Sequence, residues 1–427
     1  QSESDILIGA PAVQLEGDAT RFVREAKRHI GTNHRFQFGN RQISPQEVGA
    51  FVLKGLTENI VPMPGIELPV TEAVISVPAN FTDAQRQATM DAAKIMGLNV
   101  PMLIPEPTAA ALAYGIQNLD ADEKLVVFDF GGGTLDISLL EMFSGVIDVE
   151  RVAGDHQLGG KDIDDAIVEW VRQQVSRKYP GAKMTIAPNL LKRKCQLAKI
   201  SLSNSHSQTI FEMNAVLYRG QQVPLQIELT REDLTAIMDP ILKRATDCIE
   251  DLLRGDGSNK RVPLESISRI LMVGGSTYIP EVRQRVSEVF GKQVSTDINP
   301  DLAVAMGACA RSAIYKGIAK DDFMLADISP FSVGVETMIE TSTGPRSGYF
   351  SVLLEKNAPI PSRSTHTFHL LHPEQDSVDV KVFQGNSQWT AENEFIGSKE
   401  INNIPPSPTE TPRNLEVDFS FDVSGIL

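Results

Sequence analysis

The chain has 427 residues, with 41% hydrophobic and 22% charged residues, and its 55 acidic and 40 basic residues give a net charge of −15. This length predicts about two or three domains, and without an apolar run of roughly 18 residues we expect no membrane partner. The negative charge disfavours nucleic acid, which binds clustered Lys and Arg. The widely spaced Cys195, Cys248 and Cys309 are typical of small core residues in a reducing cytoplasm.

The first three quarters of the chain alternate apolar runs with stretches of helical periodicity. Strands are predicted at residues 73–77, 125–130 and 270–273, each followed by a turn and a helix-like stretch. Such alternation indicates an α/β fold. We therefore expect one large α/β domain over residues 1–320.

The pattern changes after residue 321. Short segments of alternating polarity, such as 377–383 and 415–421, are broken by Pro and Gly and indicate an all-β domain over residues 328–427. Residues 321–327 form a short apolar stretch bracketed by carboxylates. This stretch fits either a functional interdomain linker or an ordinary buried edge strand.

A run of three glycines between two predicted strands, in residues 127–140, is the strongest local signal for chemistry. Residues without Cβ let backbone N–H groups approach a polyphosphate, and flanking carboxylate and hydroxyl oxygens suit a hydrated Mg²⁺. A plain hairpin turn needs only one or two glycines and no flanking carboxylates. The residues that carry this prediction are Gly131, Gly132, Gly133, Asp129, Thr134 and Asp136.

Two further glycine pairs precede predicted helices. Gly274 and Gly275 follow a strand and lead through a hydroxyl residue, Ser276, to a helix with Pro280 near its start. The N-terminus of such a helix suits a phosphate or the sugar end of a nucleotide. The pair Gly159 and Gly160 fits a turn at the start of a helix equally well.

Residues 77–89 (VPANFTDAQRQAT) and 103–115 (LIPEPTAAALAYG), with the glycine motifs and the acidic-apolar stretch, resemble the DnaK-like seventy-kilodalton heat-shock chaperones in order and spacing. Residues 358–361, 372–377 and 382–385 are most similar to the HscC branch. The resemblance implies an α/β actin-like ATPase domain of two lobes, followed by an all-β peptide-binding sandwich. We expect the sequence to lack the N-terminal part of the first domain and the C-terminal part and helical lid of the second.

The resemblance implies that ATP or ADP binds with Mg²⁺ in the cleft between the lobes. Asp129 is then a contact of the Mg²⁺ waters, and Glu106 lies near the attacking water, on a turn stiffened by prolines. The implied catalytic residues are Glu106, Asp129, Thr134 and Asp136. The implied nucleotide contacts are Gly131, Gly132, Gly133, Gly159, Gly160, Lys199, Ser203, Gly274, Gly275, Ser276, Tyr278 and Asp301.

Three positions depart from the family pattern. Val13 stands where a Gly-x-x-Ala-Lys pattern places a lysine that contacts the transferred phosphate. Ile200 and Tyr278 replace arginines of the nucleoside pocket. We therefore expect slow or atypical ATP hydrolysis and weaker nucleotide binding.

The resemblance also implies a relay between the domains and a peptide groove. Pro78 and Arg86 match the relay, and the linker contributes an apolar core and an acid. Alternation alone fits plain sandwich core for the groove residues. The linker residues are Phe323, Met324, Leu325 and Asp327, and the groove residues are Val335, Met338, Phe368, Leu371, Val378 and Val380.

The partners implied are unfolded or extended hydrophobic polypeptides, a J-domain co-chaperone and a nucleotide-exchange factor. One alternative is a non-hydrolysing scaffold that uses the actin-like domain as a partner platform. A sugar or acyl kinase shares the actin-like hairpins, but the β-rich tail argues against that class.

Overall fold

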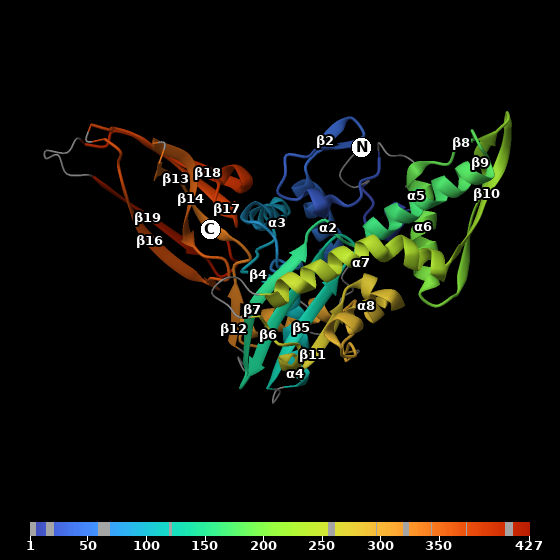
Figure 1. Cartoon of the computed structure of the whole chain (residues 1–427), viewed down its shortest axis with the longest axis horizontal. Coiled ribbons are helices and arrows are strands. Elements are labelled where there is room, and N and C mark those ends of the chain that lie inside the picture. The colour runs from blue at the N-terminus through green and yellow to red at the C-terminus, as the bar shows by residue number, and fades with distance from the viewer. Residues whose placement is uncertain are drawn as a thin grey trace.

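The computed structural model describes residues 6–13, 21–58, 69–118, 122–254, 261–295, 297–318, 324–342, 344–372, 374–405 and 413–427. A six-stranded sheet of order β11-β5-β6-β7-β12-β15 lies at the centre of the α/β region (Figure 1). No helix in these ranges is long and apolar enough to cross a membrane. The strands are β5 (Glu123–Phe130), β6 (Leu135–Phe143), β7 (Val146–Asp155), β11 (Arg269–Val273), β12 (Met324–Ile328) and β15 (Pro359–Ile360).

Strand β5 is apolar on both faces because helices cover both. Val126, Phe128 and Phe130 point into one core, whereas Leu125 and Val127 point into the other, as the two-residue period of a strand requires. The mixed α/β prediction is confirmed here. The first core packs against α5 (Gly160–Lys178), α6 (Pro188–Leu202), α7 (Arg231–Arg254) and α8 (Pro280–Phe290), and the second against α4 (Glu106–Gln117) and α9 (Ala303–Tyr315).

The N-terminal residues form a lobe beside this sheet. Strands β3 and β4 pair in parallel, and a capping box between Thr82 and Gln85 fixes the start of α3. Val77, Phe81 and Leu103 belong to the core of this lobe. Its elements are α1 (Ala10–Val13), η2 (Ala26–His29), β1 (Phe36–Phe38), β2 (Arg41–Ile43), α2 (Pro45–Glu58), β3 (Ile75–Val77), α3 (Asp83–Ile95) and β4 (Leu103–Pro105).

A second lobe extends from the α/β region on the side away from the β part (Figure 1). Its three-stranded sheet has the order β10-β9-β8, and α6 packs on β9. Figure 1 shows the β9–β10 hairpin reaching away from the central sheet. The strands are β8 (Lys183–Met184), β9 (Ser207–Tyr218) and β10 (Gln221–Thr230), and two short 3-10 helices follow later, η3 (Leu264–Ser266) and η4 (Gly275–Tyr278).

The C-terminal part is built from strands, as the alternating pattern predicts. One sheet has the order β14-β13-β17-β18 and a second pairs β16 with β19. Val333 and Leu354 of the first sheet share a small core with Phe421 of the second. The elements are β13 (Ser332–Thr341), β14 (Gly344–Leu354), β16 (Ser362–His369), β17 (Val378–Gly385), η5 (Thr390–Glu392), β18 (Glu394–Ile401) and β19 (Asn414–Phe421).

Strand β12 joins the two parts of the chain. It pairs in parallel with β7 of the central sheet and antiparallel with β15. Leu325 packs against the core beneath the sheet, whereas Met324 is 69% exposed. The acidic-apolar stretch is thus a sheet strand and also the connection between the α/β and β parts, and Phe323 lies outside the described residues.

The β part also contacts the N-terminal lobe directly, beside α3 (Figure 1). The backbone N–H of Asp83 donates to Gln384 Oε1 over 3.0 Å, and the N–H of Leu427 donates to Asp83 Oδ1 over 2.8 Å. Arg86 Nη1 donates to the carbonyl of Ser424 over 3.1 Å. Helix α3 therefore contacts both the middle strand β17 and the C-terminal end of the β part.

Candidate functional site

The glycine run forms a tight connection between β5 and β6. The N–H of Gly131 donates to the carbonyl of Thr134 over 3.1 Å, and Asp129 and Asp136 face each other across the strand pair. Gly132 does not need glycine's freedom of φ, and a Cβ placed on it would meet no heavy atom within 4 Å. The absence of side chains therefore keeps space open beside the backbone, where a ligand can approach.

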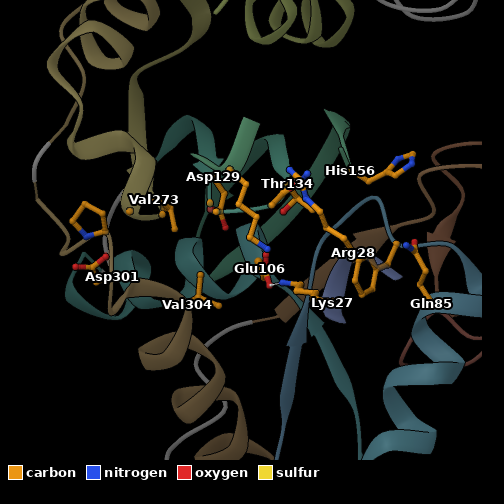
Figure 2. Close-up of a pocket in the computed structure, with 18 residues that line it drawn as sticks. Lys27, Arg28, Gln85, Glu106, Asp129, Thr134, His156, Val273, Asp301 and Val304 are labelled. Atoms are coloured by element: carbon orange, nitrogen blue, oxygen red, sulfur yellow. Dashed lines mark hydrogen bonds and ion pairs between the residues drawn. The ribbon is translucent and has the colours of Figure 1, made fainter. Parts of the chain in front are cut away.

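A cavity of 420 Å³ opens at this connection (Figure 2). Figure 2 shows Lys27 and Arg28 reaching it from the N-terminal lobe, opposite Asp301 and Val304. Asp136 lies behind the cavity wall and is only 1% exposed. The predicted site residues that line the cavity are Glu106, Asp129, Gly131, Gly132, Gly133, Thr134, Gly274, Gly275 and Asp301.

Buried carboxylates make the cavity floor electrostatically strained. Burial, with the negative charges of Glu106 and Asp136, raises the pKa of Asp129 well above its ordinary value. Burial and Glu106 raise the pKa of Asp136 to about 6, although the N–H of Asn80 donates to it. Asp136 Oδ2 has no hydrogen-bond partner among the described residues. Added positive charge at this floor would relieve the repulsion.

These carboxylates do not enclose a metal ion by themselves. Among the described residues, no group of three or more His, Cys, Asp or Glu side chains could hold a metal. Mg²⁺ commonly takes only one or two protein carboxylates and keeps several waters. Asp129, which lines the cavity, fits such a hydrated ion, and Asp136 adds negative charge behind it.

Lys27 supplies a positive charge to the cavity that the sequence analysis missed. Its Nζ lies 2.7 Å from Glu106 Oε1, the contact drawn as a dashed line in Figure 2. Val13, where the sequence predicts a lost lysine, lies in α1 and does not line the cavity. The positive charge that the sequence predicts to be missing at Val13 is supplied to the cavity by Lys27.

The start of α5 packs tightly on the glycine connection. The N–H groups of Gly160 and Lys161 donate to the carbonyls of Gly131 and Gly132, each over 3.0 Å. A Cβ on Gly159 would lie 2.6 Å from the Gly132 backbone. Gly159 thus packs against the connection instead of lining a cavity.

An ion pair joins the N-terminal lobe to the start of α5 beside this packing. Arg28 Nη2 lies 2.5 Å from Asp162 Oδ2 and donates to the carbonyl of Gly133 over 3.0 Å. Asp162 also accepts from the N–H of Gly159 over 2.7 Å. The segment that carries Lys27 is therefore tied to the start of α5.

A second cavity of 450 Å³ continues from the first along α6. Lys199 is buried and its Nζ lies 2.7 Å from both Asp164 Oδ1 and the carbonyl of Gly160. Ile200 is 56% exposed. The predicted residues on this cavity are Gly132, Gly160, Lys199, Ile200, Ser203, Gly275, Ser276, Tyr278 and Asp301, and Asp164 is a buried acid that periodicity did not single out.

The strand, glycine and helix order of the second motif is confirmed, with α8 starting at Pro280. Gly274 has φ +83, and a Cβ there would lie 2.6 Å from the carbonyl oxygen of Phe130. Ser276 Oγ donates to the carbonyl of Gly131 over 2.8 Å. A short 3-10 helix, η4, intervenes before α8 and carries Tyr278, whose ring lies under the guanidinium of Arg283 at 5.7 Å.

A third cavity, a groove of 580 Å³, lies in the β part, away from the first two. Met338 and Leu371 remain 42% and 60% exposed at this groove, which is unusual for large apolar side chains in a plain core. All six residues predicted for a peptide groove line it: Val335, Met338, Phe368, Leu371, Val378 and Val380.

Arg86 sits between the α/β and β parts and is 3% exposed. Its guanidinium donates to the carbonyls of Ala79, Phe81 and Ser424 over 3.1 to 3.3 Å. Burial raises the pKa of Asp327, while Arg86 lowers it through its positive charge. Pro78 is buried next to these carbonyls, directly after β3.

Comparison with known proteins shows the family of this chain. The family model described as Hsp70 protein matches residues 7–427. The chain belongs to the Hsp70 family. Among Hsp70 relatives, the chaperone protein DnaK of Thermotoga petrophila is 35% identical over 431 residues, covering 99% of this chain and 70% of the relative. DnaK of Cenarchaeum symbiosum is 36% identical over 434 residues, covering 100% of this chain and 63% of the relative.

The Hsp70 assignment confirms the family predicted from the two proline-containing segments and the glycine motifs. The HscC branch within the Hsp70 family stays a prediction. The domain boundaries at residues 320 and 328 and the individual roles of the site residues also remain predictions.

Proposed function

We propose that this Hsp70 protein is an ATP-dependent chaperone that binds extended hydrophobic segments and releases them under the control of ATP. The observation that carries the proposal is the coexistence of a glycine- and carboxylate-lined cavity with a separate apolar groove in one chain, joined through β12 and Arg86. Relatives named chaperone protein DnaK support the same function.

ATP or ADP would occupy the two adjoining cavities with its phosphates at the glycine connection. The open space beside Gly132 suits close approach of a phosphate to the backbone. The nucleoside would lie along α6, beside Ile200 and Tyr278. A hydrated Mg²⁺ at Asp129 and Asp136 would neutralise phosphate charge when bound.

Glu106 and Lys27 would serve hydrolysis by position and charge. Glu106 begins α4 and is held by Lys27 at 2.7 Å, so its carboxylate is aimed into the phosphate cavity and can orient a water. The ammonium of Lys27 can stabilise negative charge that develops on the transferred phosphate. Phosphoryl transfer depends mainly on such positioning and electrostatic stabilisation.

The β part would bind peptide as a β-sandwich with a groove for one apolar side chain. Main-chain hydrogen bonds accept any extended segment, while a pocket above Val378 selects a leucine-like side chain. Unfolded polypeptides are the proposed partners, together with a J-domain co-chaperone and a nucleotide-exchange factor. We also propose the cytoplasm as the location.

Release would be coupled to nucleotide through the contacts between the parts. Arg86 bonds to carbonyls of the N-terminal lobe and to Ser424 of the β part, so a lobe movement changes both ends of its network. Leu325 packs, partly buried, against the core under the central sheet only while β12 stays paired with β7. A nucleotide that prefers one lobe arrangement can therefore shift the peptide site between two states.

The test is the dissociation rate of a fluorescent leucine-rich peptide from the full natural chain, with Mg-ATP, with Mg-ADP and without nucleotide. We expect ATP to speed release relative to ADP. Arg86→Met provides the control, since it should bind both ligands but respond less to ATP. A peptide that binds but dissociates at one rate in all conditions would refute ATP control and favour the non-hydrolysing scaffold.

A further inference from the structure

Lys161 occupies the junction between the two nucleotide cavities. It lies in the first turn of α5, directly after the glycine pair that packs on the phosphate connection. Four described residues line both cavities, and Lys161 is the one among them with a positive charge: Gly132, Lys161, Gly275 and Asp301. A ligand that spans both cavities must pass this side chain.

The ammonium of Lys161 is weakly partnered compared with the other lysines at the cavities. Within the described ranges its contact is an ion pair to Glu25 Oε1 at 3.8 Å. By contrast, Lys27 and Lys199 have carboxylate partners at 2.7 Å. Lys161 is 22% exposed, so it is withdrawn from bulk water without a short hydrogen bond to replace it.

Glu25 is itself shared with a second lysine. Lys192 Nζ lies 3.5 Å from the same Glu25 oxygen and 2.8 Å from Asp165. Loss of Lys161 would therefore leave Glu25 with a cation beside it. The pair of Lys161 with Glu25 can open at low cost, because its 3.8 Å separation is too long for a hydrogen bond and Lys192 remains beside Glu25.

The surroundings of Lys161 favour an incoming anion. Partial burial, opposed by Glu25 and reinforced by Arg28, Lys192 and Arg24, lowers the pKa of Lys161 to about 8. Arg28 and Lys192 have close carboxylate partners in Asp162 and Asp165, whereas the ion pair of Lys161 in the described ranges is the longer one to Glu25. A polyphosphate at the junction would relieve the repulsion among these cations.

We propose that Lys161 exchanges Glu25 for the phosphates of the bound nucleotide and so makes the site select nucleotides with a phosphate chain over the bare nucleoside. This inference rests on the proposed nucleotide function. The exchange would also release one link between the segment at Glu25 and α5, while the Arg28 to Asp162 pair stays in place. Phosphate binding to Lys161 would thereby break the ion pair between Lys161 and Glu25 and weaken the contact across the cleft.

The experiment compares the Kd values of ADP and adenosine for the full chain, by calorimetry, in wild type, Lys161→Met, Lys161→Arg and Lys192→Met. Lys161→Met should weaken ADP about tenfold or more, as expected for loss of one charge-assisted hydrogen bond, with adenosine unchanged. Lys161→Arg should restore most of the ADP affinity. Lys192→Met is the matched control, since Lys192 shares Glu25 but lines neither cavity.

The pH profile gives a second readout. Wild-type affinity for ADP should fall as pH rises through about 8, because Lys161 loses its proton there, and Lys161→Met should flatten that fall. Equal weakening of ADP and adenosine, or no change in either, would overturn the inference while leaving the proposed function intact. If the wild type binds neither ligand, both the inference and the nucleotide function fail.

Discussion

Of the glycines that the structure describes, Gly307 leaves the least room for a Cβ, and it offers a sharp test of helix packing in the α/β region. It lies on α9 against α4, where a Cβ would stand 1.7 Å from the carbonyl oxygen of Ala109. Ordinary contact begins at 3.4 Å, so the helices would have to separate by about 1.7 Å (3.4 minus 1.7). In an open helix Gly to Ala gains up to about 1 kcal/mol. Here overpacking costs roughly 1–3 kcal/mol or more, so the clash wins.

We therefore expect Gly307→Ala to lower the Tm measured by scanning calorimetry by on the order of 5 °C. The same shift should displace Glu106 at the start of α4 and slow ATP turnover. Gly397→Ala, which meets no heavy atom within 4 Å, should leave Tm nearly unchanged. Adding Ala109→Gly should not rescue the variant, because the obstacle is backbone. A Gly307→Ala protein as stable as wild type would refute the described α4 to α9 packing.

Three further predictions concern charges and the groove. Because the pKa of Asp136 is raised from 3.8 to about 6, its contribution to the free energy of unfolding is complete below pH 4 and is lost as pH rises to 6, a loss of about 3 kcal/mol. Asp136→Asn should abolish this loss, as measured by urea unfolding without nucleotide. A free energy of unfolding that falls between pH 4 and 6 in the variant as in the wild type would contradict the prediction. Lys27→Met should slow single-turnover ATP hydrolysis about a hundredfold yet weaken ADP binding far less, and equal losses would count against a transition-state role. Val378→Phe should fill the groove and raise the Kd for peptide at least about tenfold, as measured by fluorescence anisotropy. The basal ATPase rate should stay unchanged. An unaltered Kd would mean that the peptide binds elsewhere.

Much of the fold could be predicted from the sequence because the buried strands are continuous apolar runs. Residues 125–130 and 270–273 fall within β5 and β11, each to within two residues. The strand near residue 75 is shorter than predicted, since β3 pairs with β4 only from Ile75 to Val77. The apolar pattern of residues 73–77 does not show how far the partner strand β4 extends, and that extent sets the length of β3.

The cross-lobe contacts were less predictable because they join residues far apart in sequence. Lys27 and Glu106 are separated by 79 positions, and Arg28 and Asp162 by 134. Neither pair has a periodic signature, so short motifs could locate the glycines but not the cations that face them. Asp164 was missed for the same reason, since only the tertiary fold brings it to Lys199.

The shared strand β12 has a consequence for how a signal can travel through this protein. Side chains alternate across a strand, so a slip of one residue against β7 would turn the partly buried Leu325 away from the core and put Met324 or the smaller Ala326 in its place. Shifted registers are therefore unfavourable in free energy, so β12 either pairs fully with β7 in the native register or detaches from the sheet. The coupling proposed between nucleotide and peptide, if it runs through β12, would therefore switch between two states and would not act by graded sliding of one part along the other.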